Sequence, residues 1–76
     1  MKELIEFIVK SIVNVPDSVV ITEETTEDNT VLFKLQVADE DKGRVIGRQG
    51  RVAEAMRTLL RVKAAKLGTK ARLEIM

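Results

Sequence analysis

Two glycines, Gly47 and Gly50, interrupt a stretch from about residue 40 to residue 67 that is otherwise patterned as helix. Glycine weakens helices and favours tight turns, so we expect a short helix to end at Ile46 and a long one to run from 50 or 51 to 67. The long helix has one apolar stripe, followed by a glycine suited to its C-terminal end: Ala53, Met56, Leu60, Ala64, Leu67 and then Gly68. Any fold of this chain must therefore accommodate two helices joined by a tight glycine turn.

The sequence before these helices predicts a further helix and a β-hairpin. Apolar residues at helical spacing predict a helix over 2–13, and both Phe7 in this helix and the later Phe33 are expected on core faces. β-branched residues at 19–22 and strict alternation over 30–37 predict two strands, joined by a polar turn.

The acidic run Asp39-Glu40-Asp41 precedes the short helix, and two explanations compete for it. A metal site is disfavoured, because three consecutive carboxylates cannot all point at one ion from a regular element. An acidic first turn with Asp39 as N-cap complements the helix dipole, so we expect the short helix to run from about 40 to 46.

Alternation over 71–75 predicts a closing strand and completes the order α-β-β-α-α-β. A helical crossover between the second and third strands favours parallel pairing there, beside the antiparallel hairpin. We therefore expect a single domain over 1–76 of the α+β class, with a three-stranded mixed sheet covered on one face by three helices.

Charge is divided unevenly along the chain, although the net charge is only +1. Residues 42–72 contain ten of the 13 cations and one of the 12 acids, whereas residues 1–41 contain ten acids and three cations. A compact domain with this division has a basic face that attracts polyanions. The alternative is an ordinary solvated charged surface.

Composition argues against several other classes. The chain has no Cys, His, Tyr or Trp, so it offers no thiolate metal site and no ordinary base or nucleophile near neutral pH. We expect no enzymatic activity, no cofactor and no metal. No signal peptide or membrane-length apolar run is found, so no membrane partner and a cytoplasmic location are expected.

The glycine loop, residues 47–50, reads Gly-Arg-Gln-Gly. Its spacing excludes both the Walker loop and the dinucleotide fingerprint. Arg48 lies at its tip between Arg44 and Arg51, and the positive end of the following helix favours a phosphate. Glycines also occur in helix-turn-helix joints for purely steric reasons, so the spacing alone is weak evidence.

The stretch Val45-Ile46 followed by the glycine loop resembles the Val-Ile-Gly-x-x-Gly motif of the KH domain family, and the element order is similar to the type II arrangement over the whole chain. Within that family, residues 41–51 and the Ala-rich helix after them are most similar to the KhpA family of small, single-domain bacterial KH proteins. The resemblance implies that the loop clamps single-stranded RNA.

The resemblance also implies roles for individual residues. Loop residues would hold phosphates, flanking arginines would add charge, and small apolar residues would form the floor of a narrow groove, with Ile46 expected to lie mostly in the core. The residues are Gly47, Arg48, Gln49 and Gly50 in the loop, Arg44 and Arg51 beside it, and Val45, Ile46 and Ala53 for the floor. With so few aromatic residues, stacking cannot dominate, and weak sequence preference is expected.

The apolar residues of the first helix, with Leu59 and Val62 of the last, exceed what one core face needs, which favours an association surface. The resemblance implies homodimers, a complex with a larger KH-containing partner, KhpB, and a role as an RNA chaperone or post-transcriptional regulator linked to cell-wall and cell-shape control. The runner-up function is a protein-interaction module without direct RNA contact. Duplex DNA binding is disfavoured, because the glycine joint occupies the position where a recognition helix would read bases.

Overall fold

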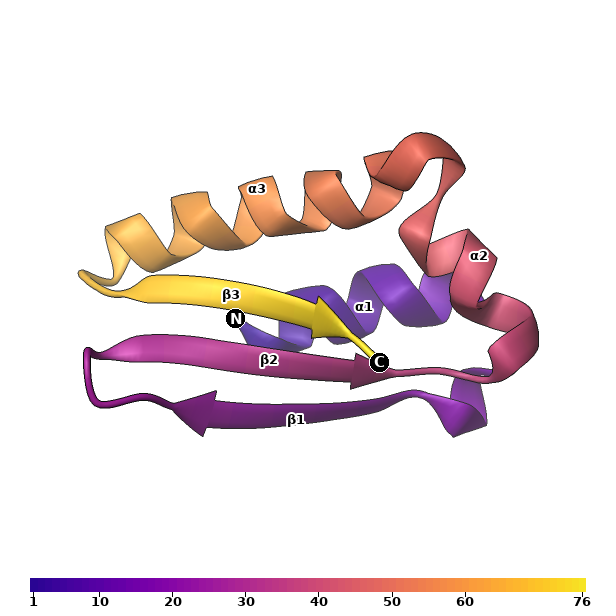
Figure 1. Ribbon diagram of the computed structural model, residues 1–76, viewed down its shortest axis with the longest axis horizontal. Coiled ribbons are helices and arrows are strands. Elements are labelled where there is room, and N and C mark those ends of the chain that lie inside the picture. Colours follow the sequence, from indigo (N-terminus) through magenta and orange to yellow (C-terminus); the bar gives the residue numbers. More distant parts are fainter.

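The computed structural model describes residues 1–76 and confirms the predicted element order (Figure 1). The elements are α1 (Lys2–Ile12), β1 (Val20–Thr25), β2 (Thr30–Gln36), α2 (Lys42–Ile46), α3 (Arg51–Lys66) and β3 (Lys70–Ile75). Short 3₁₀ turns lie at Pro16–Ser18, Asp39–Asp41 and Arg48–Gly50. The expected α+β fold, of the type II KH kind, is thus confirmed.

The three strands form one mixed sheet in the order β1-β2-β3. β1 and β2 pair antiparallel as a hairpin, and β2 and β3 pair parallel, as a helical crossover requires. Phe33 in the central strand lies opposite Glu23 of β1 and Leu73 of β3. Both predictions of strand pairing are therefore correct.

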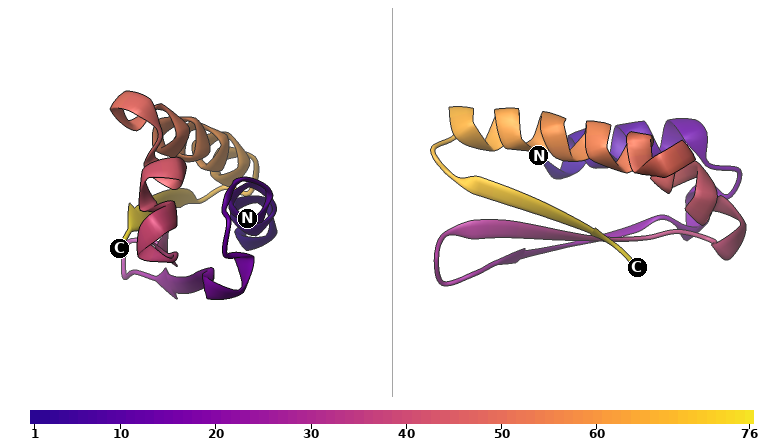
Figure 2. Two further views of the ribbon diagram at one scale, coloured as in Figure 1. Left: turned by 90° about the vertical axis from the view of Figure 1, so that its right-hand side faces the viewer. Right: turned by 45° about the horizontal axis from the view of Figure 1, so that its top comes forward.

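The helices lie on one side of the sheet. α1 and α3 lie together above the strands in the right-hand view of Figure 2, and α2 lies at the end of the sheet where the chain leaves β2. The core cluster comes from α1, β2 and the residue after it, α2, α3 and β3, and comprises Ile5, Val9, Phe33, Leu35, Val37, Val45, Met56, Leu60 and Leu73. The other face of the sheet is left uncovered by helices.

Two apolar residues assigned to core faces are exposed instead. Phe7 is 74% exposed, which corrects the expectation that both phenylalanines are core residues, while Phe33 is fully buried. Phe7 lies two residues after buried Ile5, about 200° further around the helix, so the two side chains face opposite directions. Leu67 is 60% exposed and lies just beyond the last residue of α3, Lys66, as its C-cap.

The acidic run before α2 also differs from its prediction. Asp39 does not cap a helix but is the first residue of a 3₁₀ turn, and its exposed carboxylate pairs with the Lys42 ammonium at 3.2 Å. Asp41 is completely buried, and its two carboxylate oxygens accept hydrogen bonds from the backbone N–H groups of Asn14, at 2.9 Å, and Val15, at 3.0 Å. Asp41 therefore ties the segment after α1 to the start of α2.

The C-terminal end of α3 is built as expected. Gly68 has a φ of +74°, its N–H donates to the carbonyl of Ala65, and the N–H of Thr69 donates to the carbonyl of Ala64 at 2.9 Å. These are the two bonds of a Schellman motif. They turn the chain directly from α3 into β3.

Candidate nucleic-acid interface

The glycine loop joins α2 to α3 at the upper right of Figure 1. Its backbone is left-handed at three positions: φ is +77° at Gly47, +58° at Gln49 and +75° at Gly50. Side chains rarely adopt this region, so the sharp reversal depends on the glycines.

The two glycines are required for different reasons. A Cβ atom at Gly47 would lie 2.5 Å from Cγ2 of Val52 and 2.8 Å from its backbone nitrogen, so no side chain fits there. A Cβ at Gly50 would meet nothing within 4 Å. Gly47 allows α3 to approach α2 closely, whereas Gly50 allows the left-handed turn that precedes α3 and leaves open space beside it.

The tip of the loop presents polar side chains to solvent. Arg48, Gln49 and Arg51 are exposed, and the Arg51 guanidinium donates to the Gln49 side-chain oxygen at 3.1 Å. The amides of Gly50 and Arg51 are not free for a ligand, since they donate to the carbonyls of Gly47 and Arg48 within the 3₁₀ turn. Attraction for an anion therefore comes mainly from the arginines and the helix dipole.

Val45 and Ile46, the apolar residues just before the loop, differ in burial from what was expected. Val45 is fully buried in the core, and Ile46, expected to be mostly core, is 41% exposed. Adjacent residues of a helix point about 100° apart, so burial of Val45 turns Ile46 toward solvent next to the loop. Ala53 is only 3% exposed and offers little surface to a ligand, whereas Arg44 is exposed, with its Nε atom 3.8 Å from Asp41.

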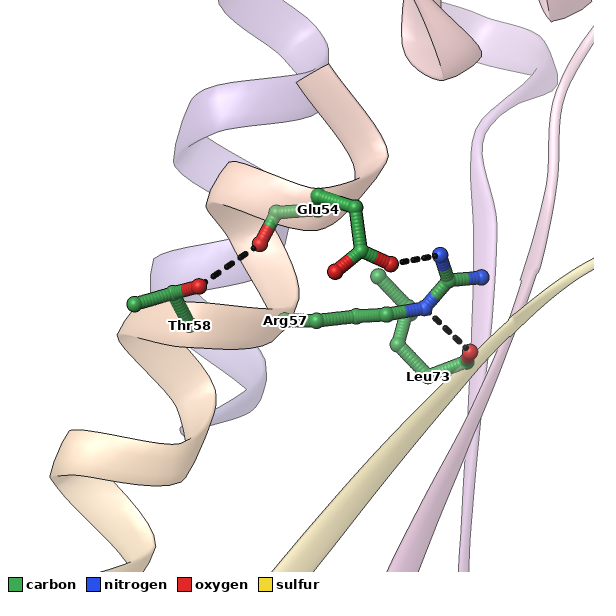
Figure 3. A network of polar contacts seen from close by, with 4 residues as sticks. All are labelled: Glu54, Arg57, Thr58 and Leu73. Atoms are coloured by element: carbon green, nitrogen blue, oxygen red, sulfur yellow. Dashed lines mark hydrogen bonds and ion pairs between the residues drawn. The ribbon is translucent and has the colours of Figure 1, made fainter. Parts of the chain in front are cut away.

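A groove of about 410 Å³ begins one turn into α3 and follows β3; we call it the α3–β3 groove. Figure 3 shows Arg57 reaching from α3 to the edge strand, where its Nε atom donates to the Leu73 carbonyl at 3.3 Å. Its Nη1 atom donates to the Glu54 carboxylate at 2.9 Å, and the Thr58 hydroxyl donates to the Glu54 backbone carbonyl. Arg57 thus bridges helix and strand inside the groove, which sequence reasoning missed because the contact joins residues far apart in the chain.

The family model described as "KhpA/KhpB, KH domain" matches residues 2–75. The chain belongs to the KhpA/KhpB KH-domain family. Three relatives named RNA-binding protein KhpA illustrate the similarity. The protein of Listeria monocytogenes serovar 1/2a is 53% identical, over 99% of this chain and 97% of the relative. The protein of Clostridium acetobutylicum is 47% identical, over 99% of this chain and 99% of the relative. The protein of Chlamydia trachomatis serovar D is 42% identical, over 100% of this chain and 96% of the relative. No solved structure matches the chain significantly.

In this KhpA/KhpB-family chain, most cations of the basic segment 42–72 have no carboxylate partner. Three are paired, Lys42 with Asp39, Arg44 with Asp41, and Arg57 with Glu54. The remaining seven have no carboxylate oxygen within 4.0 Å: Arg48, Arg51, Arg61, Lys63, Lys66, Lys70 and Arg72. Their charge is therefore available to an external anion.

No group of three or more His, Cys, Asp or Glu side chains is arranged to hold a metal ion. None of the helices has the length and apolar character needed to span a membrane.

Proposed function

We propose that this protein binds single-stranded RNA through the glycine loop. The observation that carries the proposal is the exposed Arg48-Gln49 tip at the positive end of α3, with the unpaired Arg51 beside it. The curated relatives are named for RNA binding, and a KH loop of this form clamps a short run of backbone nucleotides.

The clamp works by close approach of two backbones. With hydrogen in place of a side chain at Gly50, a phosphate approaches the N-terminal end of α3, where the helix dipole is positive. Arg48 and Arg51 neutralise the phosphates, and exposed Ile46 provides apolar contact for a base. The only exposed aromatic side chain, Phe7, belongs to α1 and is not part of the loop, so stacking contributes little.

Binding of short strands should be weak and salt-dependent. Contact with three or four phosphates predicts a slope of log affinity against log salt of roughly −2 to −3, at about −0.7 per phosphate. We expect micromolar affinity for oligouridylates of four nucleotides and weaker binding of duplexes.

The decisive experiment is the double variant Arg48→Asp/Gln49→Asp, titrated with short single-stranded RNA. Both side chains are exposed, so the fold should be retained, and binding should be lost because carboxylates replace the attraction at the clamp. The matched control is Lys63→Asp/Lys66→Gln, which changes the net charge equally on exposed positions of α3 away from the groove.

Two results would overturn the proposal. Unchanged RNA affinity in the folded aspartate variant would mean that the loop is only a steric joint. An equal loss in the control would mean that overall charge, and not the loop, attracts RNA.

A second proposed role is self-association, because α3 carries apolar side chains on the side away from the groove. Leu59 is 47% exposed and Val62 53%, whereas Glu54, Arg57 and Arg61 line the groove on another face of the same helix. RNA binding and dimerisation are therefore compatible. Such a surface suits a homodimer or a complex with a KhpB-like protein.

Self-association is tested by sedimentation of Leu59→Glu and of Leu67→Glu, an exposed leucine at the end of the same helix. We expect the wild type and Leu67→Glu to be dimers at micromolar concentration and Leu59→Glu to be a folded monomer. A wild-type monomer at high concentration would contradict the proposed self-association.

We further propose that the protein acts in the cytoplasm as an RNA chaperone or post-transcriptional regulator, including in cell-wall and cell-shape control.

A further inference from the structure

A second cavity adjoins the far end of the α3–β3 groove. This cavity, which we call the distal pocket, has a volume of about 510 Å³ and shares Arg61, Ala71 and Arg72 with the groove. It lies between the end of α3, the start of β3 and the β1–β2 turn. Its volume is in the range of sites that take a nucleotide-sized ligand.

The charge of the distal pocket is positive and largely uncompensated. Arg61, Lys70 and Arg72 line it, all three are exposed, and none has a carboxylate within 4.0 Å. The only acid in its lining is Asp28, whose carboxylate accepts a hydrogen bond from the Thr26 hydroxyl. Hydrogen bonds from Thr26 and Thr30 lower the pKa of Asp28, so it stays ionised and leaves a net excess of two positive charges in the pocket.

The pocket wall is held by a contact between distant parts of the chain. The Thr69 hydroxyl donates to the carbonyl of Asn29 at 2.6 Å, which fixes the β1–β2 turn against the turn between α3 and β3. The three cations lie on α3 and β3, and the backbone hydrogen bonds of the turn between these two elements set their relative position. Cations on such a fixed framework bind an anion at lower entropic cost than cations on a mobile segment.

The spacing connects this pocket to the glycine loop. Arg61 lies 11 residues after Gly50 in a continuous helix, which is about 16 Å along the axis. A stacked single strand covers this distance in about five nucleotides at 3.4 Å each. A strand held at the loop and continuing through the α3–β3 groove thus arrives at the pocket.

We propose that the distal pocket is a second phosphate-binding subsite, which takes the backbone of the same RNA strand beyond the nucleotides held by the glycine loop. This inference rests on the proposed function. The ligand chemistry is a phosphate, and its source is the continuing strand and not a free nucleotide.

The test is a length series of oligouridylates of four, six, eight and twelve nucleotides, each titrated at several salt concentrations. Wild-type affinity should rise with length, and the salt slope for the twelve-mer should exceed that for the four-mer by about 1.4, for two further phosphates at about 0.7 each. Arg61→Ala/Arg72→Ala should remove this extra slope and weaken twelve-mer binding about tenfold, at roughly threefold per exposed contact, while four-mer binding changes less than twofold.

Two further variants test whether the position of the charge, and not its amount, decides binding of the twelve-mer. Lys63→Ala/Lys66→Ala removes the same charge from α3 outside the pocket and should preserve the extra slope for the twelve-mer. Asp28→Asn removes the acid that opposes phosphate and should strengthen binding of the twelve-mer but not of the four-mer. Uridine monophosphate is titrated in parallel as the probe for a free-nucleotide site.

The outcomes separate this inference from the proposed function. The distal subsite is overturned, and the loop clamp stands, if the four-mer binds through the loop but the salt slope does not increase with length. The same conclusion follows if Arg61→Ala/Arg72→Ala and Lys63→Ala/Lys66→Ala lose the extra salt slope of the twelve-mer equally. Saturable binding of uridine monophosphate to the pocket, without a length effect, also overturns the distal subsite. If no oligonucleotide binds at all, the proposed function itself fails.

Discussion

The two ends of α3 both have glycines with a left-handed backbone, yet they are built differently. At the start, Gly47 leaves no room for a Cβ and is packed against Val52, so the loop is fixed by steric contact. At the end, Gly68 stands in open space and is fixed only by the hydrogen bonds of a Schellman motif. Both ends present unpaired cations, but only the start combines them with the positive end of the helix dipole. This difference supports the proposal that the start clamps a phosphate and the end guides the continuing strand.

The largest expected effect is that of Gly47→Ala. The new Cβ would overlap with Val52 side-chain and backbone atoms in a region that side chains rarely adopt. We expect a loss of about 3 kcal/mol or more, from strain and overpacking together. Thermal denaturation should show a melting temperature lower by roughly 12 °C or more, at about 4–8 °C per kcal/mol. A fully stable alanine variant would mean that the close approach of α2 and α3 is not required.

The next largest effect is expected for Asp41→Ala, which removes the link between the segment after α1 and the start of α2. Removal of this buried carboxylate leaves the N–H groups of Asn14 and Val15 without their partner. We expect a loss of about 2 kcal/mol in unfolding free energy, measured by urea titration. Asp39→Ala is the control, because Asp39 is exposed and forms only a surface ion pair; equal effects of the two changes would contradict the anchoring role.

Gly50→Ala and Gly68→Ala compare the two ends of α3 through the same substitution. Both glycines have φ near +75° and nothing within 4 Å of an added Cβ, so each change should cost about 1 kcal/mol of left-handed strain. The two variants should therefore melt at similar temperatures. RNA titration should nevertheless show weaker four-mer binding for Gly50→Ala only, because its methyl group lies at the clamp. Equal binding by both would remove the distinction between the ends.

The smallest expected effect is that of Glu54→Gln, in the first turn of α3. Glu54 is the only acid of the segment 42–72, and its carboxylate pairs at 2.9 Å with Arg57 of the same helix, which lines the groove beside it. Its neutralisation should strengthen RNA binding about two- to threefold and leave the melting temperature almost unchanged, since exposed ion pairs contribute about 0–1 kcal/mol. Glu6→Gln, which breaks the Lys10 pair on α1, is the matched control and should not change affinity.

Much of this protein could be predicted from local patterns. Strict alternation over 30–37 gave β2 within one residue, and the glycines at 47, 50 and 68 marked the limits of α2 and α3. The glycine loop and its exposed arginine were found from the sequence, since a turn that needs left-handed residues has few candidates. The α3–β3 groove and the distal pocket were not found, because each is formed by residues that are far apart in the chain.

By itself, the sequence determined the order of elements, the class of fold, the glycine turn and the division of charge, because these depend on neighbours within a few positions. Only the tertiary structure decided that Phe7 faces solvent, that Val45 and not Ile46 enters the core, and that Asp41 is a buried anchor. Periodicity gives the angle between two side chains on a helix, but it does not say which face of the helix a neighbouring element buries. That choice is made when all helices pack on one sheet at once, which minimises exposed apolar surface over the whole chain and not within each element.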